Sequence, residues 1–264
     1  MSRIRETFAR LQAAGRAAFM PYLTAGDPDL DTTRRLVLAM EAAGANLVEV
    51  GIPFSDSIAD GPTIQLANER ALARGANVRG VLEMVRALRR ESEIPVLLMG
   101  SYNPVFIYGT AAFCRDAAAA GADGLIIPDL LPDEAEELST PARTLGLDTV
   151  FLIAPTSTEE RLRLVARESR GFVYAVSLTG VTGERKTLPP DLAEFLDRAK
   201  KVIALPIAVG FGIATPEMAR EVARHAAGVI VGSAIVKRIR AACERGEDPC
   251  GPVAEFVRSM TGAL

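Results

Sequence analysis

The sequence predicts a (β/α)8 barrel, that is, a TIM barrel, and two observations carry this prediction. Short apolar segments with strand character recur eight times along the 264 residues, and amphipathic segments with helical spacing lie between them. Eight such alternations in about 250 residues match the order and the length of this fold. The rival is an open, doubly wound sheet, but no G-x-G-x-x-G motif follows the first apolar segment.

The eight expected strands are apolar along most of their length. This is typical of parallel strands that are covered on both faces. In chain order they are Ala18–Thr24, Leu47–Ile52, Pro95–Gly100, Gly124–Asp129, Thr149–Ala154, Gly171–Ser177, Pro206–Phe211 and Gly228–Ser233.

Apolar residues three and four positions apart predict helices between these strands. The clearest are Thr32–Ala43, Val78–Arg90, Ala111–Ala120, Glu159–Glu168 and Pro216–His225. Thr158 and Thr215 stand where a helix N-cap is expected, and a proline follows Thr215 at the first helical position. Gly44, Gly75 and Gly121 follow helical segments and suit a left-handed helix end.

A further amphipathic segment, Ser2–Ala13, precedes the first strand. It predicts an additional N-terminal helix that covers the lower end of the barrel. At ~150 residues per domain, the length alone permits one or two domains. Because no linker or change in composition divides the chain, we expect a single domain over residues 1–264.

The composition excludes several classes of function. Lys and Arg number 30 against 33 Asp and Glu, a net charge of −3, so no nucleic-acid partner is expected. No apolar run approaches the ~20 residues that span a bilayer, so no membrane association is expected. A single histidine and three cysteines without a C-x-x-C motif argue against a metal site and a disulfide framework, and they favour a reducing cytoplasm. Acid–base chemistry therefore falls to carboxylates, tyrosines or lysines.

Glu49 is the most informative residue of the chain. It lies inside an apolar strand, between Val48 and Val50. Burying a lone carboxylate is costly and tends to raise its pKa, which suits proton transfer near neutral pH. The alternative is a glutamate held by a structural partner inside the barrel.

The loop that follows this strand carries two further carboxylates, Asp56 and Asp60. In a TIM barrel the active site lies at the carboxyl ends of the strands, so this long loop is a candidate for function. A second long loop, residues 178–189, has the glycine and threonine content of a lid. Taken alone, Asp60 is also a candidate cap for the helix that begins near Gly61 and Pro62.

Glycine turns end the last two strands. Gly210 and Gly212 lie at the end of the seventh strand, and Gly232 with Ser233 lies at the end of the eighth, each just before a helix. Backbone N–H groups at such turns and helix N-termini bind anions, and barrels of this type hold phosphate there. We expect a phosphate site, the alternative being glycines that merely satisfy tight turns.

The sequence resembles the alpha subunit of tryptophan synthase, essentially from end to end. The matching stretches are Pro21–Pro28, Glu49–Asp56 with Ala59–Gln65, Ser177–Gly183, Gly210–Ile213 and Val231–Val236. The run from Glu49 to Gln65 is highly specific, whereas the glycine turns are shared with many phosphate-binding barrels.

The resemblance implies cofactor-independent retro-aldol cleavage of indole-3-glycerol phosphate to indole and D-glyceraldehyde 3-phosphate. It implies that Glu49 is the general acid–base, that Asp60 binds the indole N–H, and that Tyr174 positions Glu49. The residues implied around the substrate are Tyr22, Phe211 and Thr182 near the indole, and Gly183, Gly212, Gly232 and Ser233 at the phosphate.

The resemblance also implies a partner. An α2β2 heterotetramer is expected, in which a beta subunit carries pyridoxal phosphate and this chain carries no cofactor or metal. The loop containing Asp56 and the region around Asn103 would face that partner. Two departures fall in these regions, because Ser57 stands where the family commonly has proline and Gly100-Ser101 replaces a more usual Thr-Tyr pair.

Three alternatives stay open at this stage. Another phosphate-binding barrel of the indole pathway would have no reason to carry the Glu49–Gln65 block. A catalytically idle subunit would have no reason to keep both Glu49 and Asp60. A stand-alone indole-releasing lyase would use identical chemistry and differs only in needing no beta subunit.

Overall fold

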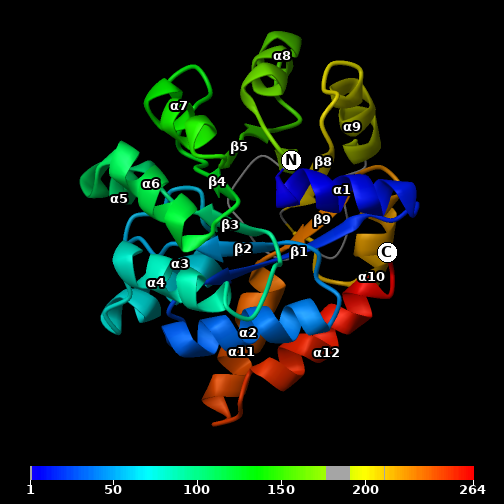
Figure 1. The fold of residues 1–264 in the computed structure, drawn as a ribbon. Coiled ribbons are helices and arrows are strands. Elements are labelled where there is room, and N and C mark those ends of the chain that lie inside the picture. The colour runs from blue at the N-terminus through cyan, green and yellow to red at the C-terminus, as the bar shows by residue number, and fades with distance from the viewer. Residues whose placement is uncertain (1, 177–190, 211) are drawn as a thin grey trace.

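The computed structural model describes residues 2–176, 191–210 and 212–264, in which a ring of parallel strands is surrounded by helices (Figure 1). The strands of the described residues are β1 Ala18–Thr24, β2 Val48–Gly51, β3 Val96–Met99, β4 Gly124–Ile126, β5 Asp148–Val150, β6 Leu152–Ile153, β7 Val173–Val176, β8 Ile207–Gly210 and β9 Gly228–Val231. Their order in the sheet is β5-β4-β3-β2-β1-β9-β8-β7-β6. The predicted TIM barrel is confirmed.

The ring closes through the fifth predicted strand, which the structure divides in two. β5 pairs with β4, and β6 pairs with β7 on the other side. Only Phe151 separates the two pieces, and its carbonyl accepts a hydrogen bond from Tyr174 N at 3.1 Å. The strand therefore exchanges one neighbour for the other at Phe151, a change that an uninterrupted apolar run does not reveal.

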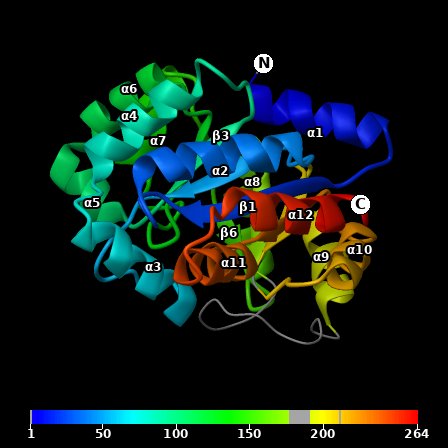
Figure 2. The same ribbon diagram turned by 90° about the horizontal axis from the view of Figure 1, so that it is seen from below.

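Twelve helices surround the strands in the described residues. They are α1 Arg3–Ala13, α2 Leu30–Ala42, α3 Pro62–Ala73, α4 Val78–Leu88, α5 Tyr102–Tyr108, α6 Thr110–Ala120, α7 Glu136–Thr144, α8 Glu159–Glu168, α9 Leu192–Lys200, α10 Pro216–Ala223, α11 Ser233–Glu244 and α12 Cys250–Thr261. The C-terminal α12 packs against α2 and α11, and the two views agree in placing it beside α2 (Figures 1 and 2).

The helix signals in the sequence are confirmed at most ends. Thr158 and Thr215 accept hydrogen bonds from the backbone three residues later, at 3.2 and 3.3 Å. Gly44, Gly75 and Gly121 have φ of 100°, 84° and 94°, as a left-handed helix end requires. The ends of several helices differ from the prediction by about two residues, the usual error of sequence-based boundaries.

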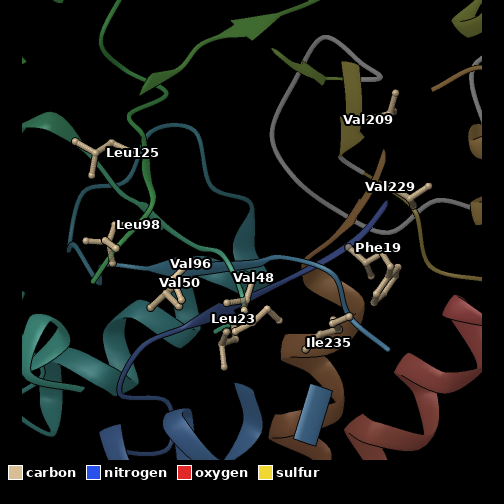
Figure 3. Packing of buried hydrophobic residues seen from close by; sticks show 14 of the residues in the cluster. Phe19, Leu23, Val48, Val50, Val96, Leu98, Leu125, Val209, Val229 and Ile235 are labelled. Atoms are coloured by element: carbon tan, nitrogen blue, oxygen red, sulfur yellow. The ribbon is translucent and has the colours of Figure 1, made fainter. Parts of the chain in front are cut away.

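Two apolar layers account for the burial of the strands on both faces. Residues such as Phe19, Val48 and Val229 point outward and pack against the helices (Figure 3). Their neighbours along the strands, including Met20 and Leu47, belong to a second cluster that fills the barrel interior. Alternate residues therefore enter different layers, and one run of sequence contributes to both.

The predicted N-terminal helix is present as α1, and it covers one end of the barrel (Figure 2). Its buried residues Ile4, Phe8 and Leu11 join the interior cluster. The Phe8 ring lies 5.5 Å from that of Phe172, between centroids. Because Phe8 and Ile4 reach the first residues of several strands, α1 closes the amino end of the barrel and leaves the carboxyl end for the site.

Candidate active site

Glu49 lies in the barrel interior, at the centre of β2. It is paired in register with Tyr22 on β1 and Leu97 on β3, whose side chains also belong to the interior. The side chain is fully buried, and neither carboxylate oxygen has a hydrogen-bond partner in the described part of the chain. Burial alone raises the pKa of Glu49 to about 8. The carboxyl group is therefore mostly protonated at neutral pH and can donate a proton.

Two tyrosines stand near this carboxyl group, Tyr22 on β1 and Tyr174 on β7. Burial is the main cause that raises the pKa of both hydroxyls, and the charges of Glu49 and Asp60 add to it, so both stay protonated. The Tyr22 hydroxyl also lies 3.3 Å from the hydroxyl of Thr24. Tyr22 and Tyr174 thus give the chamber around the two acids an aromatic wall from two strands.

Glycines make room for the two tyrosine hydroxyls. A Cβ atom on Gly51 would lie 2.2 Å from the Tyr22 hydroxyl, and one on Gly210 would lie 2.1 Å from that of Tyr174. Such distances are far shorter than any van der Waals contact. The sequence places Gly210 in a glycine turn with Gly212. In the structure, the missing side chain of Gly210 leaves the space that the Tyr174 hydroxyl occupies.

Asp60 lies in the loop between β2 and α3 and is not the cap of that helix. Gly61 is the N-cap of α3. The Asp60 carboxylate instead accepts a hydrogen bond from Asn68 Nδ2 at 3.2 Å. Burial raises the pKa of Asp60, and hydrogen bonds from the side chains of Ser57 and Asn68 lower it. These two hydrogen-bond donors favour the ionised form of Asp60. An ionised carboxylate can stabilise a positive charge on a ligand.

A cavity that Tyr22 and Asp60 share lies at the carboxyl ends of the first four strands. Tyr22, Ile52, Asp60, Met99 and Pro128 are among the residues that line it. Its lining combines apolar side chains with the polar groups of Ser57, Asp60, Ser101 and Asp129, as small-molecule sites do.

The glycine turn before α11 lies beside the same chamber. Gly232 is the N-cap of α11 and Ser233 is its first residue. A Cβ atom on Gly232 would lie 3.4 Å from Cδ1 of Tyr22, so the helix N-terminus adjoins the aromatic wall. Gly212 has a φ of 84°, a conformation that favours glycine.

The remaining expected site residues lie outside the described residues. They are Thr182, Gly183 and Phe211. Asn68 and Ser57, in contrast, were not expected at the site. A buried asparagine on the apolar face of α3, one position after Ala67 and four after Ile64, is the signal that could have found Asn68.

Two findings bear on other classes of function. Within residues 2–176, 191–210 and 212–264, no group of three His, Cys, Asp or Glu side chains could hold a metal ion. None of the helices in this part of the chain is long and apolar enough to cross a bilayer.

Comparison with known proteins identifies the family. A family model described as tryptophan synthase alpha chain matches residues 8–264. The alpha chain of Geobacter sp. strain M21 is 52% identical over 90% of this chain and 89% of the relative, and that of Geobacter sulfurreducens is 48% identical over 100% and 99%. This chain belongs to the tryptophan synthase alpha chain family.

Solved structures agree with this assignment. Tryptophan synthase subunit alpha from Legionella pneumophila has a TM-score of 0.94 and 41% identity, with 100% of this chain and 98% of that chain covered. A tryptophan synthase chain from Mycobacterium tuberculosis has a TM-score of 0.90 and 39% identity, with the same coverage. As a member of this family, the protein is a lyase that cleaves indole-3-glycerol phosphate in tryptophan biosynthesis, and the name of the family implies a complex with a beta subunit.

Proposed function

We propose that Glu49 is the general acid–base of a cofactor-independent retro-aldol cleavage of indole-3-glycerol phosphate. The observation that carries this proposal is a fully buried carboxyl group without a hydrogen-bond partner in the described residues, whose pKa is raised to about 8. An acid whose pKa lies near the working pH is both protonated enough to donate and basic enough to accept.

The proton returns to Glu49 within one turnover. Glu49 donates it to the indole ring carbon that bears the glycerol phosphate chain, which leaves a positive charge on the ring and a carboxylate on Glu49. The carboxylate then takes the proton of the adjacent glycerol hydroxyl. As the aldehyde forms, the C–C bond breaks and its electron pair neutralises the ring nitrogen. Because the indole ring is the electron sink, the reaction needs neither a lysine Schiff base nor a metal ion.

Asp60 stabilises the positive charge on the ring in this proposal. Its carboxylate accepts a hydrogen bond from the indole N–H, and the low-dielectric surroundings strengthen that interaction. Tyr174 positions Glu49, and Tyr22 packs at the indole end of the substrate, which its place in the lining of the cavity supports. On the resemblance alone, Phe211 packs against the indole, and Thr182 belongs to the lid and hydrogen-bonds near Asp60.

The phosphate group binds to backbone N–H groups at the ends of β8 and β9. Gly212, Gly232 and Ser233 supply these contacts, together with Gly183 from the second long loop. The position of Gly232 at the N-terminus of the 12-residue α11 supports this, because four backbone N–H groups of a first helical turn have no partner within the helix.

The beta subunit docks on the carboxyl face of the barrel in an α2β2 assembly. Four large apolar side chains are exposed on this face: Ile58 (79%), Phe106 (57%), Ile107 (77%) and Leu131 (44%). Ile58, Phe106 and Ile107 follow β2 and β3, in the regions around Asp56 and Asn103 where the resemblance implies the partner, and Leu131 follows β4. Large apolar side chains exposed on one face are typical of a protein interface.

Two further proposals complete the description. The chain holds no cofactor, and pyridoxal phosphate belongs to the beta subunit. The chain is cytoplasmic, which is supported by cysteines that are free at all three positions, Cys114, Cys243 and Cys250.

Indole release from indole-3-glycerol phosphate tests the assignment of Glu49. We expect Glu49→Gln to lower kcat by at least about a thousandfold, since it loses general acid–base catalysis and cannot complete the proton cycle. The control, Glu83→Gln, changes an exposed glutamate on α4 and keeps full activity. Full activity in Glu49→Gln rules out the mechanism. Measuring each protein with and without a beta subunit also distinguishes a subunit that depends on its partner from a stand-alone lyase, whose activity a beta subunit leaves unchanged.

A further inference from the structure

The side chains of Ser57 and Asn68 form a polar cluster with the Asp60 carboxylate. Asn68 Nδ2 donates to Asp60 Oδ2 at 3.2 Å and to Ser57 Oγ at 3.1 Å. The Ser57 side chain also lowers the pKa of the Asp60 carboxyl, as that of Asn68 does. Both supporting side chains are buried, with exposed fractions of 8% for Ser57 and 2% for Asn68. The three residues therefore form a closed polar cluster at the edge of the cavity.

The orientation of the Asn68 amide follows from its neighbour. An ionised carboxylate only accepts hydrogen bonds, so the NH₂ group must face Asp60. As a result Asn68 Oδ1 is buried without a partner in the described part of the chain. A buried polar atom without a partner is uncommon and unfavourable. The Asn68 amide thus gives a hydrogen bond to the Asp60 carboxylate, while its own oxygen receives none.

The backbone of Ser57 fixes the same turn. Its carbonyl accepts a hydrogen bond from Asp60 N at 3.3 Å and another from Gln65 Nε2 at 3.5 Å. These contacts close a turn over residues 57–60 and tie it to α3. The backbone and the hydroxyl of one residue therefore both restrict where the Asp60 carboxylate can point.

We propose that Ser57 is a positioning residue that aims the Asp60 carboxylate at the indole N–H of the substrate, with Asn68 as its anchor. This inference rests on the proposed role of Asp60. In this chain the recognition of the indole N–H therefore depends on the hydroxyl group of Ser57.

Ligand binding tests this role without needing turnover. Indole-3-propanol phosphate keeps the ring and the phosphate but has no glycerol hydroxyl, and its N-methyl derivative also lacks the N–H. The ratio of their dissociation constants, measured by calorimetry, reports the hydrogen bond to Asp60. We expect Ser57→Ala to reduce the preference for the N–H compound about tenfold, which is ~1.4 kcal/mol, the scale of one hydrogen bond to a charged group. Ser57→Thr keeps the hydroxyl and should keep the preference.

Two further variants make the outcome decisive. Ser92→Ala removes an equally buried serine hydroxyl, which accepts from Ile94 N far from Asp60, and should leave the ratio unchanged. Asp60→Ala sets the ratio that remains without the carboxylate. If Asp60→Ala leaves the wild-type preference intact, the proposed role of Asp60 is wrong. If Asp60→Ala abolishes the preference and Ser57→Ala preserves it, Ser57 does not position Asp60.

The kinetics of the same variants give a second readout. We expect Ser57→Ala to lower kcat for indole-3-glycerol phosphate more than it changes KM, since the ring carries its positive charge after binding. A purely structural serine would instead lower the urea midpoint and leave both the kcat and the ligand preference of the folded protein unchanged. That result overturns the proposal.

Discussion

The burial of Glu49 both suits it to proton transfer and lowers the free energy of unfolding at alkaline pH. Its pKa is about 8 in the folded chain and near its ordinary value of 4.5 in the unfolded chain. Between these two values the folded state holds a proton that the unfolded state has lost, so the free energy of unfolding falls as pH rises. Above about pH 8 the group is ionised in both states and the loss is complete.

We therefore predict that Glu49→Gln stabilises the protein at alkaline pH. At ~1.4 kcal/mol per pKa unit, the gain reaches a few kcal/mol at pH 8 to 9 and shrinks toward pH 5. Urea unfolding of both proteins across this range measures it. Glu83→Gln serves as the control and should show no pH-dependent difference from the wild type. A Glu49→Gln variant that is equally stable at all pH values contradicts the burial of an unpaired carboxyl group.

The residues that the sequence could identify are those whose type conflicts with their local pattern. Glu49 interrupts an apolar strand, and that conflict is visible without a structure. Ser57 and Asn68 are ordinary in their local sequence, and only the fold of the loop onto α3 brings them to Asp60. For the same reason the role of Asp60 as a possible helix cap could not be decided until Gly61 was seen at the cap position.

At the scale of the elements, the ends of the strands are shaped by side chains on neighbouring strands. We predict that Gly51→Ala and Gly210→Ala each destabilise the protein by about 1–3 kcal/mol, the usual effect of overpacking. In each variant a methyl group would overlap a tyrosine that packs against the backbone. The urea midpoint measures the loss. Gly251→Ala, at a helical position with nothing within 4 Å, is the control and should be neutral or slightly stabilising.

The N-terminus of α11 carries a prediction about substrate affinity. Gly232→Val should raise KM for indole-3-glycerol phosphate about tenfold or more, because branched bulk at the cap obstructs the approach of a phosphate to the helix N–H groups. The Cβ atom itself meets only ordinary contacts, so the fold should persist, as circular dichroism can check. A variant with unchanged KM shows that phosphate binds elsewhere.

The sequence predicts elements well here because each strand is buried on both faces and each helix on one. Continuous apolar runs and helical spacing record that burial directly. The division of one strand at Phe151 escaped prediction since it depends on which neighbour each half pairs with. Helix α2 begins two residues early for a local reason, the Asp29 cap, whose side chain accepts from Thr32 N at 2.7 Å.

On the scale of the whole molecule, the two ends of the barrel differ in purpose. The amino end is closed by α1, where Ser2 caps the helix and donates a hydrogen bond to Asp148, and Arg3 contacts Asp123 at 3.1 Å. The carboxyl end holds the cavity and the exposed apolar residues. The amino end of the barrel thus contributes to stability, and the carboxyl end carries the functional site. A single domain over residues 1–264 stays our prediction.

This asymmetry predicts which surface changes affect the partner. Ile107→Glu should weaken binding of a tryptophan synthase beta subunit at least about tenfold, because a charge would be buried in an apolar interface. Titration calorimetry with the purified beta subunit measures the change. Leu145→Glu alters an equally apolar exposed residue at the C-terminal end of α7, near the opposite end of the barrel, and should leave the affinity as it is. Equal losses in both variants contradict the proposed docking face.

The central claim is that Glu49 carries a proton at neutral pH and transfers it to the indole ring. Carbon-13 NMR of protein labelled at the glutamate side-chain carboxyl carbons measures that proton most directly. We predict one resonance that titrates near pH 8 in the wild type and is absent from Glu49→Gln. If every glutamate resonance of the folded wild type titrates below pH 6, Glu49 is ionised at neutral pH and the claim is wrong.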